Sequence, residues 1–329
     1  MDKMPRISVI IPVSPDSKSP PVLNSLRKVD YPCDSIEIIV SVGRQPSRQR
    51  NQAVMASKGD VLYFLNSDSR IEPDVFRKAI HIISKDKKIA GVGGPDLTPQ
   101  DNNCIQYLFG YAMGSYFAHW RMRARYLGVG KDRITDEKEL LLSNMVIRRD
   151  IYLKANGFNE KLYPNEENEL INRITDMGYR FVYNPGIKIY RDRRKTLFTF
   201  AKQFYRYGQG RMKQVFIEGF LANFLFFLPL FLLAYIFVLL YLKRSWINFT
   251  PLFLYIMLGV TDAIYTSFKN RRALLSFILP AVYITMHVSY SAGMLVSIYN
   301  HLFRRDNSTR WRDNCKIVYI KEFNKPFNK

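Results

Sequence analysis

The sequence predicts a mixed α/β domain built around a parallel nucleotide-binding sheet, followed by a region of membrane helices. Short apolar runs alternate with short helical patterns over the first part of the chain, which is typical of a right-handed parallel α/β sheet. From Gly219 onward, long apolar stretches dominate instead. The length of 329 residues fits about two such units.

The first strand is expected at Ile7–Val13, a run without a polar face, as in a parallel sheet covered on both sides. A helix at Ser19–Lys28 and a second strand at Ile36–Val42 follow. Residues 43–51, rich in Arg, Gln, Ser and Pro, are expected to form a loop, and residues 52–57 a short helix.

Val61–Leu65 is the third expected strand, because it is apolar with β-branched and aromatic residues. Four small oxygen-bearing residues come directly after it: Asn66, Ser67, Asp68 and Ser69. Ligands bind outside the carboxyl ends of the strands in open α/β sheets, so a carboxylate here is well placed to hold Mg²⁺ or Mn²⁺. The alternative is a turn that simply ends the strand.

Further along, a helix is expected at Pro73–Ser84, a glycine-rich strand at Ile89–Pro95 and another helix from Pro164 to about Met177. Residues 106–126 are rich in aromatic and small side chains. Two interpretations stay open for them, packing on the sheet and contact with the membrane surface.

Composition excludes several classes of protein. A net charge of +21 would suit nucleic acid, but the Lys and Arg residues are scattered or flank apolar stretches, where they suit anionic lipid headgroups. No nucleic-acid partner is therefore predicted.

Three unclustered cysteines give neither a disulfide framework nor a zinc pattern, which favours a reducing compartment. Ile7–Val13 is too short for the apolar core of a signal peptide, and there is neither a Gly-x-Gly-x-x-Gly fingerprint nor a P-loop.

Three apolar stretches are candidate membrane spans: 219–242, 247–268 and 273–299. The second contains Asp262, whose carboxylate is costly at that depth and marks a candidate functional residue. Three full spans would place the basic tail after Arg304 outside, against the positive-inside rule. Either one segment does not span or the rule fails here. The favoured interpretation is a non-spanning segment and a cytosolic tail.

Six short motifs follow one another along the globular part: Ile7–Val13, Pro46–Asn51, Asn66–Asp68, Ser143–Asn144, Gly157–Phe158 and Asn165–Leu170. In this order they resemble the family-2 inverting glycosyltransferases of the GT-A fold, and most of all their membrane-anchored exopolysaccharide and cell-surface glycan branch. The resemblance covers nearly the whole globular part. It implies a GT-A, Rossmann-like domain that binds a nucleotide sugar.

In that family, an Asp-x-Asp at the end of a central strand contacts the nucleotide sugar and binds the divalent metal. Asp68 matches the second position, so the resemblance implies that Asp68 holds Mg²⁺ or Mn²⁺. Asn66 stands at the first position, where its amide can hydrogen-bond a ribose or phosphate. Pro12 and Arg50 complete the implied donor-binding set. A solvated basic loop is the alternative for Gln49 and Arg50.

The family's Glu-Asp pair near the acceptor, which supplies the catalytic base, corresponds to Glu166–Glu167. The resemblance therefore makes Glu167 the base and places Glu166 near the acceptor or the diphosphate. A carboxylate can accept the proton of an acceptor hydroxyl as the new bond forms. For Glu166 and Glu169, the alternative is stabilisation of a helix N-terminus by acidic side chains.

The segment Gln203–Tyr207 is similar to the Gln-x-x-Arg-Trp element that borders the acceptor site in processive members of the family. By this resemblance Gln203, Arg206 and Tyr207 contact the acceptor or its diphosphate. Arg206 can bind a phosphate bidentately, and Tyr207 can pack on a sugar or prenyl unit. The alternative is an amphipathic interfacial helix, and both interpretations can hold together.

The prediction divides the chain into a GT-A domain (1–195), an interfacial helix (196–216), two to three membrane helices (217–303) and a basic tail (304–329). The predicted activity is inverting transfer of a sugar from a UDP- or GDP-linked donor to a lipid-linked acceptor, either polyprenyl phosphate or a lipid-linked saccharide. The enzyme would be a multi-pass protein of the cell (inner) membrane with a cytoplasmic catalytic domain. Alternatives are a processive polysaccharide synthase and a non-catalytic membrane-anchored subunit that binds nucleotide sugar.

Overall fold

The structure is a computed structural model that describes residues 4–17, 20–241, 245–303 and 315–320. The chain forms two compact units. Unit 1 comprises residues 1–99, 124–192 and 308–329, and unit 2 comprises residues 100–123 and 193–307.

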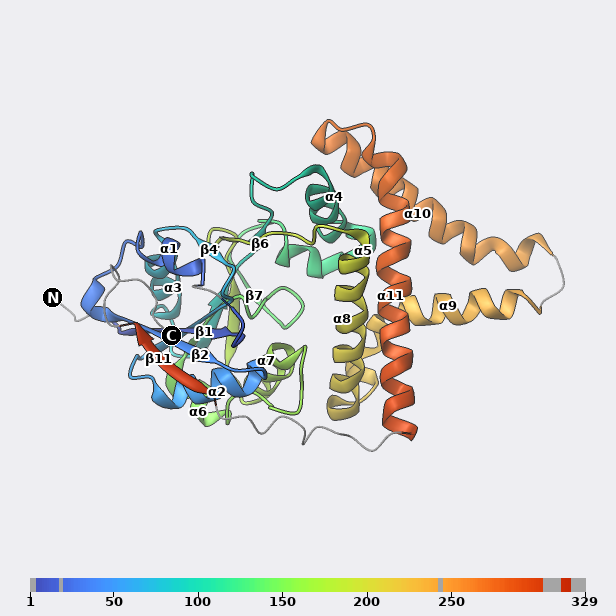
Figure 1. The fold of residues 1–329 in the computed structure, drawn as a ribbon. Coiled ribbons are helices and arrows are strands. Elements are labelled where there is room, and N and C mark those ends of the chain that lie inside the picture. The colour runs from blue at the N-terminus through green and yellow to red at the C-terminus, as the bar shows by residue number, and fades with distance from the viewer. Residues whose placement is uncertain (1–3, 18–19, 242–244, 304–314, 321–329) are drawn as a thin grey trace. The chain divides into compact units, whose positions relative to one another are not determined.

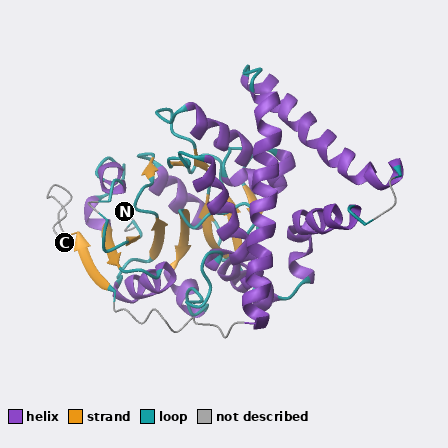
Figure 2. Cartoon of the chain, turned by 45° about the vertical axis from the view of Figure 1, so that its right-hand side comes forward, coloured by secondary structure: helices purple, strands orange, loops and turns teal. Residues whose placement is uncertain are grey.

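Unit 1 is built around an eight-stranded mixed sheet with the order β11-β2-β1-β3-β8-β5-β9-β7 (Figures 1 and 2). These strands are β1 (Ile7–Val13), β2 (Ile36–Val42), β3 (Val61–Leu65), β5 (Ile89–Gly93), β7 (Arg133–Thr135), β8 (Asn144–Arg148), β9 (Arg180–Tyr183) and β11 (Lys316–Ile320). A second sheet has the order β4-β10-β6 and contains β4 (Arg70–Ile71), β6 (Asp96–Leu97) and β10 (Ile189–Tyr190).

The first three strands are parallel, as the sequence predicts: β1 pairs in parallel with both β2 and β3. The sheet as a whole is mixed, however. β8 lies antiparallel between β3 and β5, and β7 and β11 are also antiparallel to their neighbours. The predicted parallel pairing therefore holds for β1, β2 and β3 and for the pair β5–β9, but not for β7, β8 and β11. A buried strand has the same apolar pattern in either direction, so its sequence does not reveal the difference.

Two apolar layers cover the faces of this sheet, which explains why β1 lacks a polar face. Val9 and Ile11 point to one layer and Ile10 to the other, and all three are fully buried. The first layer includes α1 (Val22–Leu26) and α3 (Val75–Ile83), and the second includes α2 (Pro46–Ala56), α6 (Arg149–Lys154) and α7 (Glu166–Asp176).

The stretch expected as a loop at 43–51 is mostly helical, because α2 begins at Pro46. Proline suits the first turn of a helix, where the missing N–H has no partner in any case. Helix α2 therefore includes the whole segment Ser47–Asn51 and positions it against the sheet.

Part of the expected basic tail forms a strand of unit 1. β11 pairs antiparallel with β2, with Lys316 opposite Val42. Ile317 packs against one core layer and Val318 against the other, and the Tyr319 hydroxyl donates to the carbonyl of Ala56 at 2.8 Å. The end of the chain thus covers the edge of the sheet that β2 would otherwise expose.

Unit 2 is helical (Figure 1). Its helices are α4 (Cys104–Met113), α5 (Tyr116–His119), α8 (Leu197–Glu218), the 3₁₀ segment η3 (Leu221–Phe227), α9 (Leu228–Leu239), α10 (Trp246–Asn270) and α11 (Leu275–Phe303). By length and composition, two of them could cross a membrane, α10 and α11. The first expected span, 219–242, is broken into η3 and the 12-residue α9.

Candidate active site

The turn after β3 presents a carboxylate to solvent. All five residues of β3 are buried, and the chain turns sharply because the N–H of Ser69 donates to the carbonyl of Asn66 at 3.2 Å. The N–H of Val22 donates to the carbonyl of Ser67 at 3.1 Å and holds the turn against α1. Asp68 is exposed at this turn. The carboxylate that the sequence singles out is therefore free to meet a ligand at the carboxyl end of a central strand.

The carboxyl ends of β1 and β2 are tied together by Gln49. Its Nε2 donates to the carbonyls of Val13 at 2.9 Å and of Ser41 at 2.5 Å, and its side chain is buried. The N–H of Gly43 donates to the same Val13 carbonyl at 3.0 Å. Gln49 therefore shapes this corner of the sheet and is not part of a solvated loop. Pro12 lies half-buried in β1 beside it.

Helix α7 begins with two glutamates in different surroundings. Glu166 is 2% exposed, whereas Glu167 is only half-buried. The preceding residue, Asn165, has φ +83°, so the chain enters the helix through a left-handed residue. Asparagine tolerates this conformation better than most side chains. The sharp entry leaves Glu167, the predicted base, on the more accessible side of the first turn.

Arg50 joins the first turn of α7 to the turn after β3. Its Nη1 donates to Glu166 Oε1 at 2.8 Å and its Nη2 to Asn66 Oδ1 at 3.3 Å. Arg50 is 5% exposed, and its Nε is buried without a hydrogen-bond partner. Arg50, Asn66 and Glu166 are thus brought together; Glu167 is next to Glu166 in the chain, and Asp68 is two residues after Asn66. A neutral amide stands at position 66, where the family that the sequence resembles has Asp, and Glu166 is the carboxyl group that pairs with Arg50.

Burial makes this ion pair sensitive to pH. Loss of solvation and repulsion from Glu167 raise the pKa of Glu166 to about 7, although Arg50 opposes the rise. Near neutral pH, the Glu166 carboxyl is therefore partly protonated. Glu166 is not a solvated residue of a helix N-terminus.

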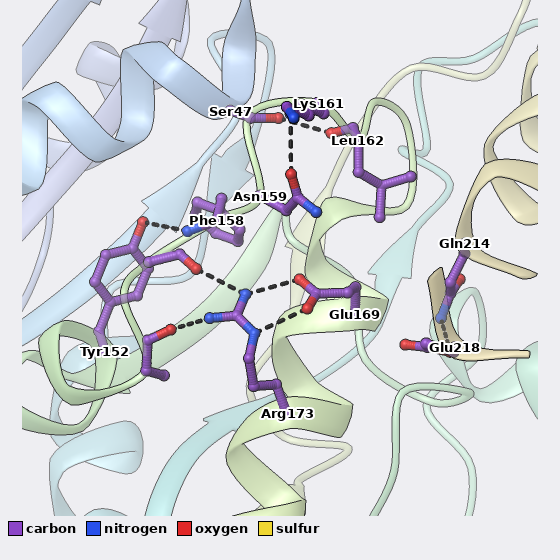
Figure 3. Close-up of polar contacts among 12 residues, drawn as sticks. Ser47, Tyr152, Phe158, Asn159, Lys161, Leu162, Glu169, Arg173, Gln214 and Glu218 are labelled. Atoms are coloured by element: carbon purple, nitrogen blue, oxygen red, sulfur yellow. Dashed lines mark hydrogen bonds and ion pairs between the residues drawn. The ribbon is translucent and has the colours of Figure 1, made fainter. Parts of the chain in front are cut away.

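Glu169 has a structural role on the same helix. Arg173 donates to its two carboxylate oxygens at 2.8 and 2.7 Å, and it also donates to the carbonyls of Ala155 and Gly157 (Figure 3). Gly157 has φ +66°, a conformation that favours glycine. This cluster fixes the loop before α7, and it explains why a Gly-Phe pair precedes the acidic motif.

Sequence reasoning gave no role to two amide side chains that shape the site. Asn51 in α2 accepts hydrogen bonds from the Tyr152 hydroxyl at 2.6 Å and from the N–H of Phe158 at 2.9 Å. Asn168 in α7 accepts from Arg125 Nη2 at 2.8 Å. Both residues lie inside the motif segments, and that position is the only signal for them in the sequence.

The remaining predicted residues belong to unit 2 and lie on α8. Gln203 Nε2 donates to the Tyr207 hydroxyl at 2.8 Å, and Arg194 Nε donates to Gln203 Oε1 at 2.9 Å. Arg206 is exposed. Gln203 and Tyr207 therefore form one polar pair on consecutive turns of the helix, whereas Arg206 points into solvent.

The sheet, the polar turn after its central strand and the acidic helix beside that turn define a GT-A glycosyltransferase. The family model of glycosyl transferase family group 2 matches residues 61–296, which is more than half of the chain. The chain belongs to this family.

Among solved structures, the chain is similar to the mannosyltransferase PcManGT from Pyrobaculum calidifontis, which was determined in complex with GDP-Man and Mn²⁺. The TM-score is 0.54 with 13% sequence identity, and the match covers 91% of this chain and 88% of that one. At this identity the likeness concerns the fold. No curated protein is significantly similar to the chain.

Proposed function

We propose that the protein transfers a sugar, with inversion, from a nucleotide-diphosphate sugar to a lipid-linked acceptor at the cytoplasmic face of the cell membrane. The contact of Arg50 with both Asn66 and Glu166 carries this proposal. It ties the donor-side turn, which includes Asp68, to the helix that includes Glu167. Donor and base are then held in one rigid arrangement, as a displacement at the anomeric carbon requires.

With a lipid-linked saccharide as acceptor, Glu167 accepts the proton of the attacking hydroxyl while the hydroxyl oxygen bonds to the anomeric carbon. With polyprenyl phosphate, a phosphate oxygen attacks instead, and Glu167 accepts a proton only when that phosphate is monoprotonated. The bond from that carbon to the diphosphate oxygen breaks, and the nucleoside diphosphate leaves with the electron pair. Attack from the face opposite the leaving group inverts the configuration. Buried Arg50 directs Glu166 away from solvent, so Glu167 is the accessible carboxylate of the pair.

A divalent cation fits the donor side. Hard cations such as Mg²⁺ and Mn²⁺ are often held by one or two carboxylates together with substrate phosphates, and the exposed Asp68 offers such a carboxylate. When bound, the cation would offset negative charge that builds up on the leaving diphosphate. Asn66 contributes a neutral amide, whose oxygen already accepts from Arg50. Asp68 is therefore the main protein ligand in this proposal.

The acceptor side is assigned to Gln203, Arg206 and Tyr207 on α8. Arg206 is exposed and able to bind a phosphate, and the Gln203–Tyr207 pair presents an aromatic ring with a fixed hydroxyl. A polyprenyl phosphate or a lipid-linked saccharide offers both a phosphate and an apolar chain. The exposed apolar helices of unit 2 support a membrane location for such an acceptor.

The test is release of nucleoside diphosphate by protein purified in detergent. Donors are GDP-mannose and a panel of UDP-sugars, offered with polyprenyl phosphate or membrane lipid extract, with and without Mn²⁺. The expected result is metal-dependent release from one donor, abolished in Asp68→Ala and Glu167→Gln but retained in the control Asp150→Asn, an exposed carboxylate of α6. Tight donor binding without turnover on any acceptor would favour the non-catalytic subunit. Long polymeric products would favour the processive synthase.

A further inference from the structure

The helices of unit 2 differ in how much protein covers them. Helix α9 has no buried residue, and α10 has none from Trp246 to Leu258. The apolar window of α10 is 11% buried, against 39% for α11. In Figures 1 and 2, α9 and α10 form a hairpin that projects from α11. Uncovered apolar surface is thus most continuous on this hairpin, which has Trp246 (92% exposed) near its tip, while α11 also exposes apolar side chains such as Phe277 (80% exposed).

The second half of α11 is covered by α8. The two helices run in the same direction, because Gly208 lies against Tyr290 and the ring of Phe216 stacks on His301, 3.9 Å between centroids. A Cβ added at Gly208 would collide with the carbonyl oxygen of Tyr290. The backbones therefore touch, and α8 occupies one whole side of α11 in this region.

The first half of α11 packs on the segment that contains α5. Asp262 of α10 accepts hydrogen bonds from the Tyr283 hydroxyl at 2.6 Å and from the N–H groups of Tyr116 and Phe117 at 3.2 and 3.4 Å. The ring of Phe117 lies 5.5 Å from those of Tyr283 and His287. The buried carboxylate is thus satisfied by neighbouring groups, which gives it a structural role in holding α10, α11 and α5 together.

Chain connections determine on which side of a membrane these helices end. The segment 304–315 joins α11 to β11, which is a strand of the catalytic sheet. This segment contains four arginines and two aspartates, and such a sequence does not cross hydrocarbon. The C-terminal end of α11 is therefore on the side of the catalytic sheet.

Both ends of α8 lie on that side as well. Its first residue, Leu197, follows unit 1 after a short link, and its last turn lies beside the end of α11 through Phe216 and His301. The outer face of α8 exposes Lys202, Arg206 and Lys213, which are costly to place in lipid. Because α11 packs against α8 and against the α5 segment along its length, it lies with them on the catalytic side of the membrane.

We propose that the chain enters the bilayer only through the α9–α10 hairpin, which inserts from the catalytic side and returns to it, while α11 lies along the membrane surface. The occupant of the apolar hairpin surface is lipid hydrocarbon, since α9 is apolar all round and an uncovered helix of that kind is stable only in such surroundings. The exposed apolar side chains of α11, Val288 and Tyr299 among them, then meet the boundary between headgroups and acyl chains. Among the described residues, α10 and α11 are the helices long and apolar enough to span a membrane, and of these two only α10 then enters it.

The test measures depth, so its result does not depend on catalysis. Single cysteines in a background without native cysteines are introduced at Phe237 of α9, Phe253 of α10, and Val288 and Tyr299 of α11, all of them exposed. Each is labelled with an environment-sensitive fluorophore, and the full chain is placed in vesicles whose lipids have a quencher either near the headgroup or near the chain end. We expect the deep quencher to act most strongly on the labels at Phe237 and Phe253, and the shallow one on those at Val288 and Tyr299.

Strongest deep quenching at Val288 would overturn the proposal, because that residue would then lie mid-membrane on a spanning α11. A second measurement is the side of the two ends of the chain. Epitope tags added to both termini should be cleaved by protease together in inside-out vesicles and protected together in right-side-out vesicles. Tags on opposite sides would equally refute the hairpin arrangement, whichever sugar the enzyme transfers.

Discussion

The buried carboxylate of Glu166 gives a prediction about stability and pH. Its pKa is about 7 in the folded protein, against an ordinary value of 4.5, so the folded state holds the proton more tightly than the unfolded state does. The stability contributed by this proton is fully present below pH 4.5 and is lost as the pH rises through 7. The difference of about 2.5 (about 7 minus 4.5), at about 1.4 kcal/mol for each unit, corresponds to roughly 3–4 kcal/mol.

In Glu166→Gln, the side chain remains neutral at every pH. Near pH 4.5 the variant and the natural protein should unfold with similar free energies, since the glutamate is then protonated in the folded state. By pH 8 the variant should be the more stable by roughly 3–4 kcal/mol, which raises its melting temperature by about 7–14 °C. Calorimetry in detergent between pH 4.5 and pH 8 measures this difference.

The control is Asp176→Asn at the exposed C-terminal end of the same helix, which also removes one carboxylate but leaves the buried Arg50–Glu166 pair intact. A difference between natural protein and Glu166→Gln that is the same at pH 4.5 and pH 8 would refute the reasoning. Such a result would mean that Glu166 is ionised in the folded protein at both pH values, because its attraction to Arg50 outweighs the cost of burying the charge.

Three further predictions concern other parts of the chain. Asp68→Asn should raise the Mn²⁺ concentration needed for half-maximal nucleotide release at least tenfold, and an unchanged metal titration would argue against Asp68 as the ligand. Gly293→Ala should destabilise the protein by about 1–3 kcal/mol, because the new Cβ meets the backbone of α8, whereas Ala281→Ser on the exposed side of α11 should change the melting temperature little. Val318→Asp should release β11 by placing a charge against the core, seen as faster tryptic cleavage after Lys316 in the intact protein; equal cleavage rates would show that the strand tolerates the charge.

The sequence predicted the parts of the fold that depend on local patterns. The apolar runs of β1, β2 and β3 and the polar turn at Asp68 lie where they were expected, because burial and turn chemistry act over a few residues. Strand direction depends on distant partners, so the antiparallel β8 had no local signal. The helical start at Pro46 was read as a loop because α2 lacks an apolar stripe in its first two turns.

The candidate site was less predictable than the fold. The order of the motifs predicted the positions of Asp68, Glu166 and Glu167. The contact of Arg50 with Asn66 and Glu166 joins three separate segments of the chain, and the spacing of residues in the sequence does not predict such a contact. The same holds for Gln49, whose hydrogen bonds to two strand ends give it a structural role. Long-range polar contacts of this kind depend on the assembled sheet.

The pairing of β11 with β2 also sets an order of events during synthesis. β2 leaves the ribosome early, whereas β11 follows the whole of unit 2, a delay of roughly 15–55 seconds at about 5–20 residues per second. During that interval, the edge of β2 has unpaired N–H and C=O groups, which can pair with strands of other chains and so promote aggregation. A chain whose translation stops within the hairpin would keep this edge open and remain recognisable to chaperones. The catalytic sheet is thus completed only after the helices of unit 2 have been made.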